Sequence, residues 1–274
     1  MNAALLGYLD WLRGHGLSFA VADDLWQGAD HDGPLIDDDA ETRPIELPGL
    51  PPFVEHRNPA AGIAADHATM FVAEALLRAG VVTPGCRFWD VGCGTGVLAV
   101  VAGLAGARTI VATELDARAI AVARRTAAEA GINVQFFKGS LLEPIPAKGI
   151  AEVVAANLPH KPVPYGSRLP LGQDGGPDGD EVHGSFVAQA EDRLTAGARI
   201  AFFLHSLPHP RLLARYTEAF DLTLLAWKRR YLAVAEYGFL QDHFLARRES
   251  NDSYVGDEGD RHFLLAGAWL AVRR

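Results

Sequence analysis

The spacing of hydrophobic residues along the chain changes several times, and each change predicts an element. Apolar residues recur at helical spacing from Ala3 to Leu12 and stop before two glycines, which predicts a short helix. A second helical stripe covers 63–79 and ends at Gly80. From residue 87 onwards, short apolar runs alternate with helical patterns. The predicted strands are 87–91, 108–113, 132–137, 151–156 and 198–204, and the predicted helices between them are 96–105, 116–130, 182–194 and 209–219.

Strands that alternate with helices predict a parallel sheet with helices on both faces. Two further strand-like runs, 221–236 and 261–272, are expected to pair antiparallel near the C-terminus. We therefore expect an α/β fold with a doubly wound, mostly parallel seven-stranded sheet and an antiparallel C-terminal pair. The segment 30–52 is rich in Asp and Pro and predicts an acidic loop. This places a boundary near residue 55, with a helical and loop cap in 1–54 and the main domain in 55–274.

Charge and cysteine content narrow the classes of function. The chain has 274 residues, with 25 Lys and Arg against 34 Asp and Glu, so its formal charge is −9. This charge opposes binding to a phosphate backbone, and we expect no nucleic-acid partner. Cys86 and Cys93 suit neither a disulfide framework nor a metal site, which favours a reducing compartment. His205 and His209 lie among prolines that prevent a shared helix, so they are interpreted as turn residues and no metal is expected. No run of eighteen uncharged apolar residues occurs, so we expect a cytoplasmic protein without a membrane partner.

The most informative motif joins the strand at 87–91 to the next helix. It reads Asp-Val-Gly-Cys-Gly-Thr-Gly from Asp90 to Gly96. Glycines at alternate positions let the backbone turn tightly and approach a ligand closely. The dinucleotide-binding pattern has a different spacing, and Val97 occupies the position of its third glycine, which argues against a nicotinamide-dependent dehydrogenase. The Asp90 carboxylate would repel a pyrophosphate but suits a ligand with a positive centre.

A second acidic residue lies where a ribose would bind. The strand at 108–113 is followed by Glu114, about 20 residues after the glycine loop, which is the usual place for a carboxylate that binds ribose hydroxyls. Together the two features resemble the class I S-adenosylmethionine-dependent methyltransferases. The resemblance implies S-adenosylmethionine as cofactor, with its adenine beside the loop after the third strand. The expected cofactor-binding residues are Asp90, Gly92, Gly94, Thr95, Gly96, Glu114, Leu115, Ser140, Leu141 and Asn157.

The fourth strand of the sheet continues into Asn157-Leu158-Pro159-His160. This tetrapeptide resembles the Asn-Pro-Pro-Tyr motif of methyltransferases that modify a nitrogen attached to a planar group, including the HemK-type release-factor glutamine methyltransferases. Such a nitrogen is a poor nucleophile unless acceptors hold its N–H groups, and the Asn157 side chain and the Leu158 carbonyl would supply two. Pro159 would stiffen the turn, and His160 would stack on the planar group or accept a proton. We expect all four residues to be catalytic, mainly by orienting the substrate.

Five further polar residues are candidates for substrate binding. The similarity to the HemK type covers about residues 55–235, including a segment that covers the active site and a Gly- and Asp-rich stretch at 172–180. His56, Arg57 and His67, in or next to the first segment (58–74), would donate to a substrate carboxylate or simply solvate a loop. Others in the C-terminal region would reach the same crevice. The candidates are His56, Arg57, His67, Glu236 and His243.

The favoured interpretation is an S-adenosylmethionine-dependent N-methyltransferase that modifies an amide or guanidino nitrogen of a small metabolite. The acidic chain suits a small cationic acceptor. The N-terminal part is also shorter than the helical substrate domain of a release-factor enzyme. Two alternatives stay open. One is a protein-glutamine N-methyltransferase that acts on a release factor, and the other is a non-catalytic, methyltransferase-like binding module.

Overall fold

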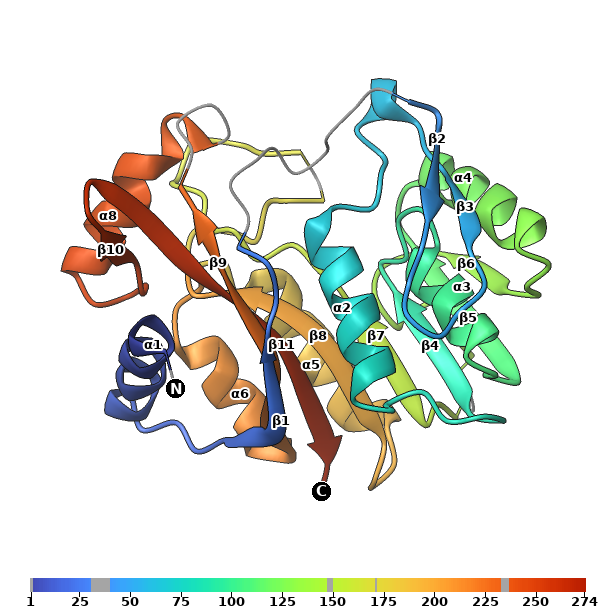
Figure 1. Ribbon diagram of the computed structural model, residues 1–274, viewed down its shortest axis with the longest axis horizontal. Helices are drawn as coiled ribbons and strands as arrows, with labels where there is room; N and C mark the ends of the chain where they lie inside the picture. Colours follow the sequence, from blue (N-terminus) through green and yellow to red (C-terminus); the bar gives the residue numbers. More distant parts are fainter. Residues whose placement is uncertain (1, 31–39, 147–149, 171, 233–236) are drawn as a thin grey trace.

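The computed structural model describes residues 2–30, 40–146, 150–170, 172–232 and 237–274 (Figure 1). In this part of the chain, a large sheet runs in the order β1-β9-β11-β8-β7-β4-β5-β6, and β10 pairs with β11 outside that path. Its strands are β1 (Ala20–Gln27), β4 (Arg87–Val91), β5 (Thr109–Glu114), β6 (Gln135–Lys138), β7 (Val153–Ala156), β8 (Arg199–His205), β9 (Phe220–Tyr231), β10 (Gly256–Glu258) and β11 (Arg261–Arg273).

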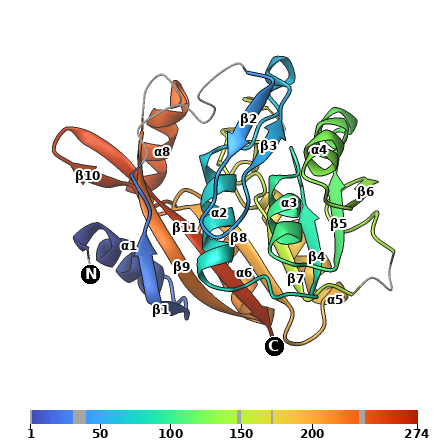
Figure 2. The same cartoon turned by 45° about the vertical axis from the view of Figure 1, so that its right-hand side comes forward.

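Helices cover both faces of this sheet. A separate hairpin, β2 (Thr42–Ile45) and β3 (Phe53–His56), lies beside α4 (Figure 2). A 3₁₀ turn, η1 (Pro59–Ala61), follows the hairpin. The described helices are α1 (Ala3–Gly14), α2 (His67–Arg78), α3 (Val97–Leu104), α4 (Ala117–Glu129), α5 (Glu181–Arg193), α6 (Arg211–Ala219) and α8 (Leu240–Glu249).

The strand directions confirm the predicted fold class. Strands β4 to β8 pair in parallel, and β11 lies antiparallel between β8 and β9. After β6 the chain returns to form β7 on the other side of β4, so the strand order reverses between these two neighbours. The carboxyl ends of β4 and β7 are level, because Val91 is paired with Ala156. In doubly wound sheets, ligands bind outside the carboxyl ends at such a reversal.

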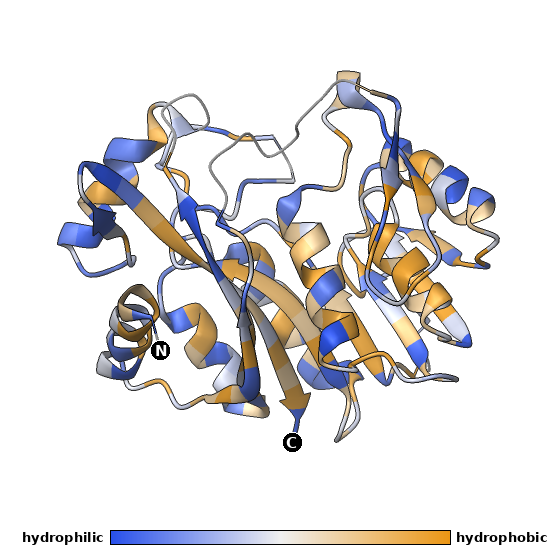
Figure 3. Ribbon diagram, in the orientation of Figure 1, coloured by the Kyte–Doolittle hydropathy of each residue, from blue (hydrophilic) through white to orange (hydrophobic). Residues whose placement is uncertain are grey.

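Two hydrophobic cores hold the layers together. Successive side chains of a strand point to opposite faces, so β4 contributes Phe88 to one core and Trp89 to the other. The core on the Phe88 face lies under α2, α3 and the hairpin, and the core on the Trp89 face lies under α1, α5 and α6. Figure 3 shows the central strands largely in the apolar colour, whereas outer helices such as α4 and α8 mix polar and apolar residues.

Several elements differ from the sequence expectations. Helix α2 begins at His67 rather than near residue 63, because the Asp66 side chain caps it by accepting from the Thr69 backbone N–H at 2.9 Å. Strands β1 and β10 and helix α8 were not predicted, so the sheet of the described residues has nine strands and the expected number of seven is wrong. Part of the expected acidic loop forms the hairpin, and residues 31–39 lie outside the described residues. The predicted boundary at residue 55 falls within β3, and β1 of the predicted cap pairs with β9 of the main domain. The division into a cap (1–54) and a domain (55–274) therefore stays a prediction. Of the helices described, none is long and apolar enough to cross a bilayer.

Candidate active site

The three glycines after β4 all have positive φ, but they differ in what a side chain would meet. Gly92 has φ +70°, and a Cβ there would lie 2.9 Å from the Leu158 side chain. Gly96 has φ +79°, and a Cβ there would lie 3.0 Å from the Ala123 Cβ on α4. Gly94 has φ +53°, and a Cβ there would meet no atom within 4 Å. The first and third glycines therefore serve packing within the protein, whereas the second leaves open space at the carboxyl edge of the sheet.

Asp90 lies beneath the glycine loop and caps a helix. Its carboxylate accepts a hydrogen bond at 2.9 Å from the Ala99 backbone N–H in the first turn of α3. Only 1% of Asp90 is exposed, and this burial raises the pKa of its carboxyl to about 7. Thr95 is buried as well. Asp90 therefore supports the loop from below, and direct contact of Asp90 and Thr95 with a cofactor stays a prediction.

Glu114 lies at the tip of β5 and receives three backbone hydrogen bonds. One carboxylate oxygen accepts from Gly94 N–H at 3.0 Å, and the other accepts from Leu115 N–H at 2.7 Å and from Asp116 N–H at 3.0 Å. Two carboxylate oxygens offer about four acceptor positions, so capacity remains for a hydroxyl donor. The neighbouring Leu115 side chain is 48% exposed and offers an apolar surface beside the carboxylate.

The loop after β6 closes against the same strand tip. Gly139 N–H donates to the Glu114 backbone carbonyl at 3.0 Å, and Glu143 N–H donates to the Ser140 carbonyl at 3.0 Å. Leu141 has φ +48°, a left-handed conformation that is uncommon outside glycine. The Glu114 carboxylate is suited to ribose hydroxyls. Together with the exposed Leu115 side chain and the open space at Gly94, it fits the nucleoside part of S-adenosylmethionine.

Asn157 lies at the carboxyl end of β7, and its side chain is held from α2. The amide nitrogen donates to the Thr69 hydroxyl oxygen at 2.9 Å and to an Asp66 carboxylate oxygen at 3.3 Å. The carboxylate only accepts, so the amide nitrogen faces it. The side-chain oxygen Oδ1 of Asn157 accepts no hydrogen bond from any of the described residues. It is thus the part of Asn157 that is available to a ligand.

His160 differs from its expected role. Only 6% of the residue is exposed, and its ring centroid lies 5.0 Å from that of His205 and 5.6 Å from that of Phe203. Burial lowers the pKa of its imidazole to about 4, so the ring is neutral near pH 7. Its Nδ1–H donates to the Leu158 carbonyl at 2.7 Å. The prediction that this ring stacks on the substrate is therefore wrong, because other side chains already cover it.

The Gly-rich stretch at 172–180 folds over the backbone of His160. A Cβ at Gly175 would lie 2.6 Å from the His160 Cα, and one at Gly179 would lie 2.6 Å from the His160 carbonyl oxygen. Gly175 N–H donates to the Lys161 carbonyl at 3.0 Å. These glycines therefore allow close packing around the Asn157–His160 segment. Pro159, in the same segment, is half-buried.

Of the expected substrate-binding residues, His67 lies near His205, which contacts this segment. Its ring, on the first turn of α2, lies 6.3 Å from the ring of His205. His56 instead pairs with Glu129 at 2.6 Å, at the far end of α4, about 18 Å along that helix from its start beside Glu114. The prediction that His56 lines the crevice is therefore wrong.

Two further candidates, Arg57 and His243, lie after β3 and on α8. Arg57 is buried, and its backbone N–H donates to the Glu41 carbonyl at 2.8 Å. His243 lies on α8 with its ring 6.2 Å from that of Phe244, in a separate hydrophobic cluster. Glu236 lies outside the described residues.

Sequence reasoning missed Asp66, Thr69 and His205. The first two form a helix-capping pair, Asp-x-x-Thr, which is a recognisable local signal. His205 is the last residue of β8 and not a turn residue, so its place at the carboxyl edge of the sheet was the available signal.

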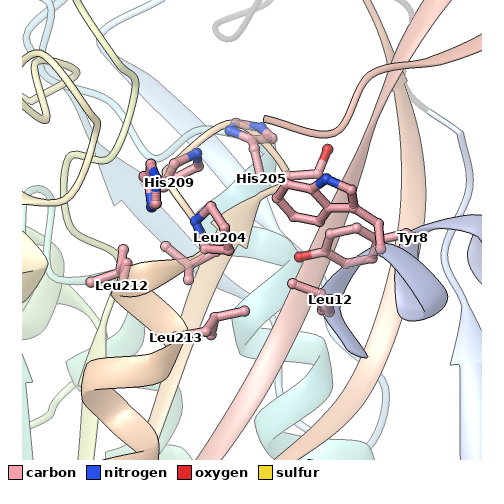
Figure 4. A pocket seen from close by; sticks show the side chains of 11 residues that line it. Tyr8, Leu12, Leu204, His205, His209, Leu212 and Leu213 are labelled. Atoms are coloured by element: carbon pink, nitrogen blue, oxygen red, sulfur yellow. The ribbon is translucent and has the colours of Figure 1, made fainter. Parts of the chain in front are cut away.

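A small cavity lies between His205 at the end of β8 and helix α1 (Figure 4). Tyr8 and Leu12 of α1 line it together with Leu204, and its volume is about 10 Å³. This space admits at most one water molecule. It is therefore too small for a substrate or a cofactor.

Comparison with known proteins places this geometry among methyltransferases. Residues 64–163, which contain the glycine loop, Glu114 and Asn157, match the family Ribosomal protein L11 methyltransferase (PrmA). A ribosomal protein L11 methyltransferase of Pelotomaculum thermopropionicum is 42% identical over 34% of this chain and 30% of its own length. A Methanocaldococcus jannaschii protein, provisionally named a protein N5-glutamine methyltransferase, is 28% identical over 43% of this chain and 61% of its own length.

Two ribosomal RNA methyltransferases are similar over more of the chain. The ribosomal RNA small subunit methyltransferase C of Chromohalobacter salexigens is 29% identical over 61% of this chain and 45% of its own length. The solved 16S rRNA N2-G1207 methyltransferase of T. thermophilus, in complex with AdoMet and guanosine, covers 86% of this chain and 51% of its own. It has a TM-score of 0.53 at 18% sequence identity, and so shares the fold. The chain spans less than two thirds of each of these relatives.

Residues 64–163 are thus similar to a methyltransferase family, and the chain shares its fold with a solved S-adenosylmethionine-binding methyltransferase. The comparisons also correct one sequence prediction. The sequence predicted a small-metabolite partner and excluded nucleic acid. That prediction is wrong, because the relatives are named for ribosomal protein L11 and for ribosomal RNA. Net charge was a poor guide here, because it averages over a whole surface and says nothing about the few residues at a site.

Proposed function

We propose that the protein is an N-methyltransferase that transfers the methyl group of S-adenosylmethionine to a side-chain nitrogen of a protein. The observation that carries this proposal is the placement of Asn157. It follows β7, next to β4 with its glycine loop, and its amide nitrogen is bound by Thr69 and Asp66. Its Oδ1 atom is thereby left as an acceptor beside the proposed cofactor site. The packing of Leu158 against Gly92 joins the two parts.

The chemistry follows from two fixed acceptors. S-adenosylmethionine, when bound, supplies a methyl group on a positively charged sulfonium, which makes a good leaving group. Asn157 Oδ1 and the second lone pair of the Leu158 carbonyl would accept the N–H groups of the substrate and direct the nitrogen lone pair at the methyl carbon. The new N–C bond replaces the S–C bond, and the nitrogen releases one proton to solvent. No residue of the chain forms a covalent bond in this scheme.

Three observations favour a protein substrate. The matched family is named for methylation of ribosomal protein L11, and one relative is provisionally named for protein glutamine. Several arginines near the C-terminal strands are already paired with carboxylates. The pairs are Arg211 with Asp178 and Asp180, Arg229 with Asp30, and Arg248 with Asp257. A phosphate backbone would have to displace these carboxylates to bind the same guanidinium groups.

An exposed aromatic residue that follows Asn157–His160 in the sequence suits a macromolecular substrate. Tyr165 is 90% exposed and follows His160 by five residues. It lies in a tight turn in which Ser167 N–H donates to the Pro164 carbonyl at 3.0 Å and Gly166 has φ +84°, the pattern of a type II turn. Tyrosine is enriched at the centres of protein interfaces. The turn therefore offers a contact point for a protein that presents its nitrogen to Asn157.

A second candidate is the exocyclic amine of a base in ribosomal RNA. The observation that favours it is the similarity to the small subunit methyltransferase C, which extends over 61% of this chain. The amine of a base is also a nitrogen attached to a planar ring, so the same two acceptors would hold it. An exposed tyrosine stacks on unpaired bases as well as on protein surfaces.

Separate acceptors distinguish these functions. The full chain is incubated with tritiated S-adenosylmethionine and, in parallel, with ribosomal protein L11, a peptide-chain release factor or 16S rRNA. We expect label in one of the protein arms, at a mass increase of one or more methyl groups, and none with the Asn157→Ala variant. Label in the rRNA arm alone would replace the protein proposal by the second candidate. The absence of S-adenosylmethionine binding in calorimetry would contradict both.

A further inference from the structure

We call Asn157–His160 the acceptor segment. His205 contacts this segment at His160. It ends β8, the strand next to β7, and only 4% of it is exposed. Its side-chain Nδ1 lies 3.1 Å from His160 Nε2, and its backbone nitrogen lies 3.2 Å from the same atom. Two donors of one residue thus converge on a single ring nitrogen of His160. His205 does not touch Asn157 or Leu158 in any described hydrogen bond.

The hydrogen bonds fix the tautomer of both rings. His160 Nδ1 faces the Leu158 carbonyl, which only accepts, so Nδ1 carries the proton. Nε2 of the neutral His160 ring is then an acceptor, and it receives the His205 backbone N–H. The His205 ring must therefore present a protonated Nδ1 to the same atom. Its own Nε2 is buried and has no hydrogen-bond partner among the described residues.

The surroundings keep this pair in its neutral, packed form. The His183 ring on α5 lies 5.8 Å from the His160 ring, edge to face, and the Phe203 ring on β8 lies 4.9 Å from the His205 ring. The charged and titratable groups that act on the pair are those of α2, of the segment after β7, and of α5 and β9. They are Asp66, His67, Lys161, His183 and Arg230. Burial is the main cause that lowers the pKa of both rings, since the charged form loses its hydration.

We infer that His205 is a positioning residue of the acceptor site, which fixes the direction of the Leu158 carbonyl through the ring of His160. This inference rests on the proposed N-methyltransferase function. One lone pair of the carbonyl binds His160 Nδ1–H, and the other is directed to the N–H group of the substrate. The two acceptors of the site are thus held by separate elements. Helix α2 holds Asn157 through Thr69 and Asp66, and strand β8 holds Leu158 through His205 and His160.

Two amide variants of His205 test the inference with matched chemistry. The amide nitrogen of Asn reaches about the position of histidine Nδ1, whereas that of Gln reaches about the position of Nε2. His205→Asn therefore keeps the side-chain donor to His160, whereas His205→Gln removes it and leaves only the backbone N–H of residue 205 as donor. We expect kcat to fall about tenfold in His205→Gln, as for the loss of one buried hydrogen bond, and to stay within about twofold of wild type in His205→Asn. The affinity for S-adenosylmethionine should not change in either variant.

A measurement without turnover tests the geometry directly. Long-range ¹H–¹⁵N spectra of the full chain report which nitrogen of each histidine carries the proton. We expect the Nδ1–H form for His160 in the wild type. In His205→Gln, we expect the signal of His160 Nε2 to shift toward that of an acceptor without a side-chain partner. An Nε2–H form in the wild type would overturn the inference, and so would equal kcat values in the two variants. If the spectra agree and the wild type transfers no methyl group, the proposed function fails while the positioning contact stands.

Discussion

The side-chain amide of Asn157 donates a hydrogen bond to the hydroxyl oxygen of Thr69, 2.9 Å away and 88 residues earlier in the chain. The Thr69 hydroxyl in turn donates to an Asp66 carboxylate oxygen at 3.0 Å, the same oxygen that caps helix α2. The start of this helix and the end of β7 are thus joined by one hydrogen-bonded group. Because this group occupies the amide nitrogen of Asn157, it sets where the amide oxygen lies.

Removal of the Thr69 hydroxyl should reduce catalysis more than stability. In Thr69→Ala the capping bond from the Thr69 backbone N–H to Asp66 remains, but Asn157 loses its shorter partner. We expect kcat to fall about tenfold and the free energy of unfolding to fall by about 1 kcal/mol. Steady-state kinetics and urea unfolding measure the two effects. Thr69→Ser retains the hydroxyl and should behave like the wild type, and an inactive Ser variant would contradict this role.

Asp90 should make stability depend on pH near neutrality. Its pKa is about 7 in the folded protein, above the ordinary value of 3.8. Between these values the folded state holds a proton that the unfolded state has lost, so stability falls as the pH rises through the window, by up to about 1.4 kcal/mol per pH unit. Asp90→Asn is neutral and keeps an acceptor for Ala99 N–H. The free energy of unfolding of Asp90→Asn, relative to that of the wild type, should increase from pH 4 to pH 7. A difference that stays constant would show that the pKa of the Asp90 carboxyl is not raised.

The buried histidines should have the opposite effect in acid. Burial lowers the pKa of His183 well below its ordinary value of 6.5, and its Nδ1 pairs with the Tyr216 hydroxyl at 2.9 Å. Below pH 6.5, the His183 ring therefore binds a proton in the unfolded state but stays neutral in the folded state. This contribution is complete above pH 6.5 and is lost as the pH falls, by up to about 1.4 kcal/mol per pH unit. In His183→Asn the slope of unfolding free energy between pH 5 and 6.5 should be smaller, and an unchanged slope would be evidence against the assignment.

Tyr165 should affect recognition of the substrate and not the transfer step. Its side chain is exposed and outside the hydrogen bonds that hold Asn157 and Leu158. With a protein substrate, Tyr165→Ala should raise KM by about tenfold, the effect of a modest interface contact, with kcat and S-adenosylmethionine affinity unchanged. Tyr165→Phe keeps the ring and should have a KM near that of the wild type. A KM in Tyr165→Ala equal to that of the wild type would remove this turn from the substrate surface.

The central strands were predictable from sequence because their signal is local. Residues 87–91 form a short buried run between turns, and β4 has these bounds. The start of α2 was placed too early, since apolar residues continue upstream of the Asp66 cap. Strand β1 has no regular alternation, and its partner β9 lies about 200 residues later, so its assignment depends on a tertiary contact.

The candidate site was predictable where one motif contains its chemistry. The glycine loop, Glu114 and Asn157 meet at one edge because parallel strands end there. The pairing of His56 with Glu129 joins residues 73 positions apart, and the sequence offers no local sign of it. The covering of His160 by His205 and Phe203 likewise depends on which strand lies beside β7. Local patterns thus identified the strand ends, and the packing between elements decided what each side chain does.

The most direct test of the account is the rate of methyl transfer from tritiated S-adenosylmethionine by Asn157→Ala, measured together with the dissociation constant of the cofactor. Asn133→Ala is the matched control, since Asn133 is exposed and precedes β6. We predict that transfer falls by about 100-fold or more in Asn157→Ala, as when a group that orients the reacting atoms is lost, while the dissociation constant changes by less than about threefold. Transfer by Asn157→Ala at the rate of the wild type and of Asn133→Ala would contradict the account.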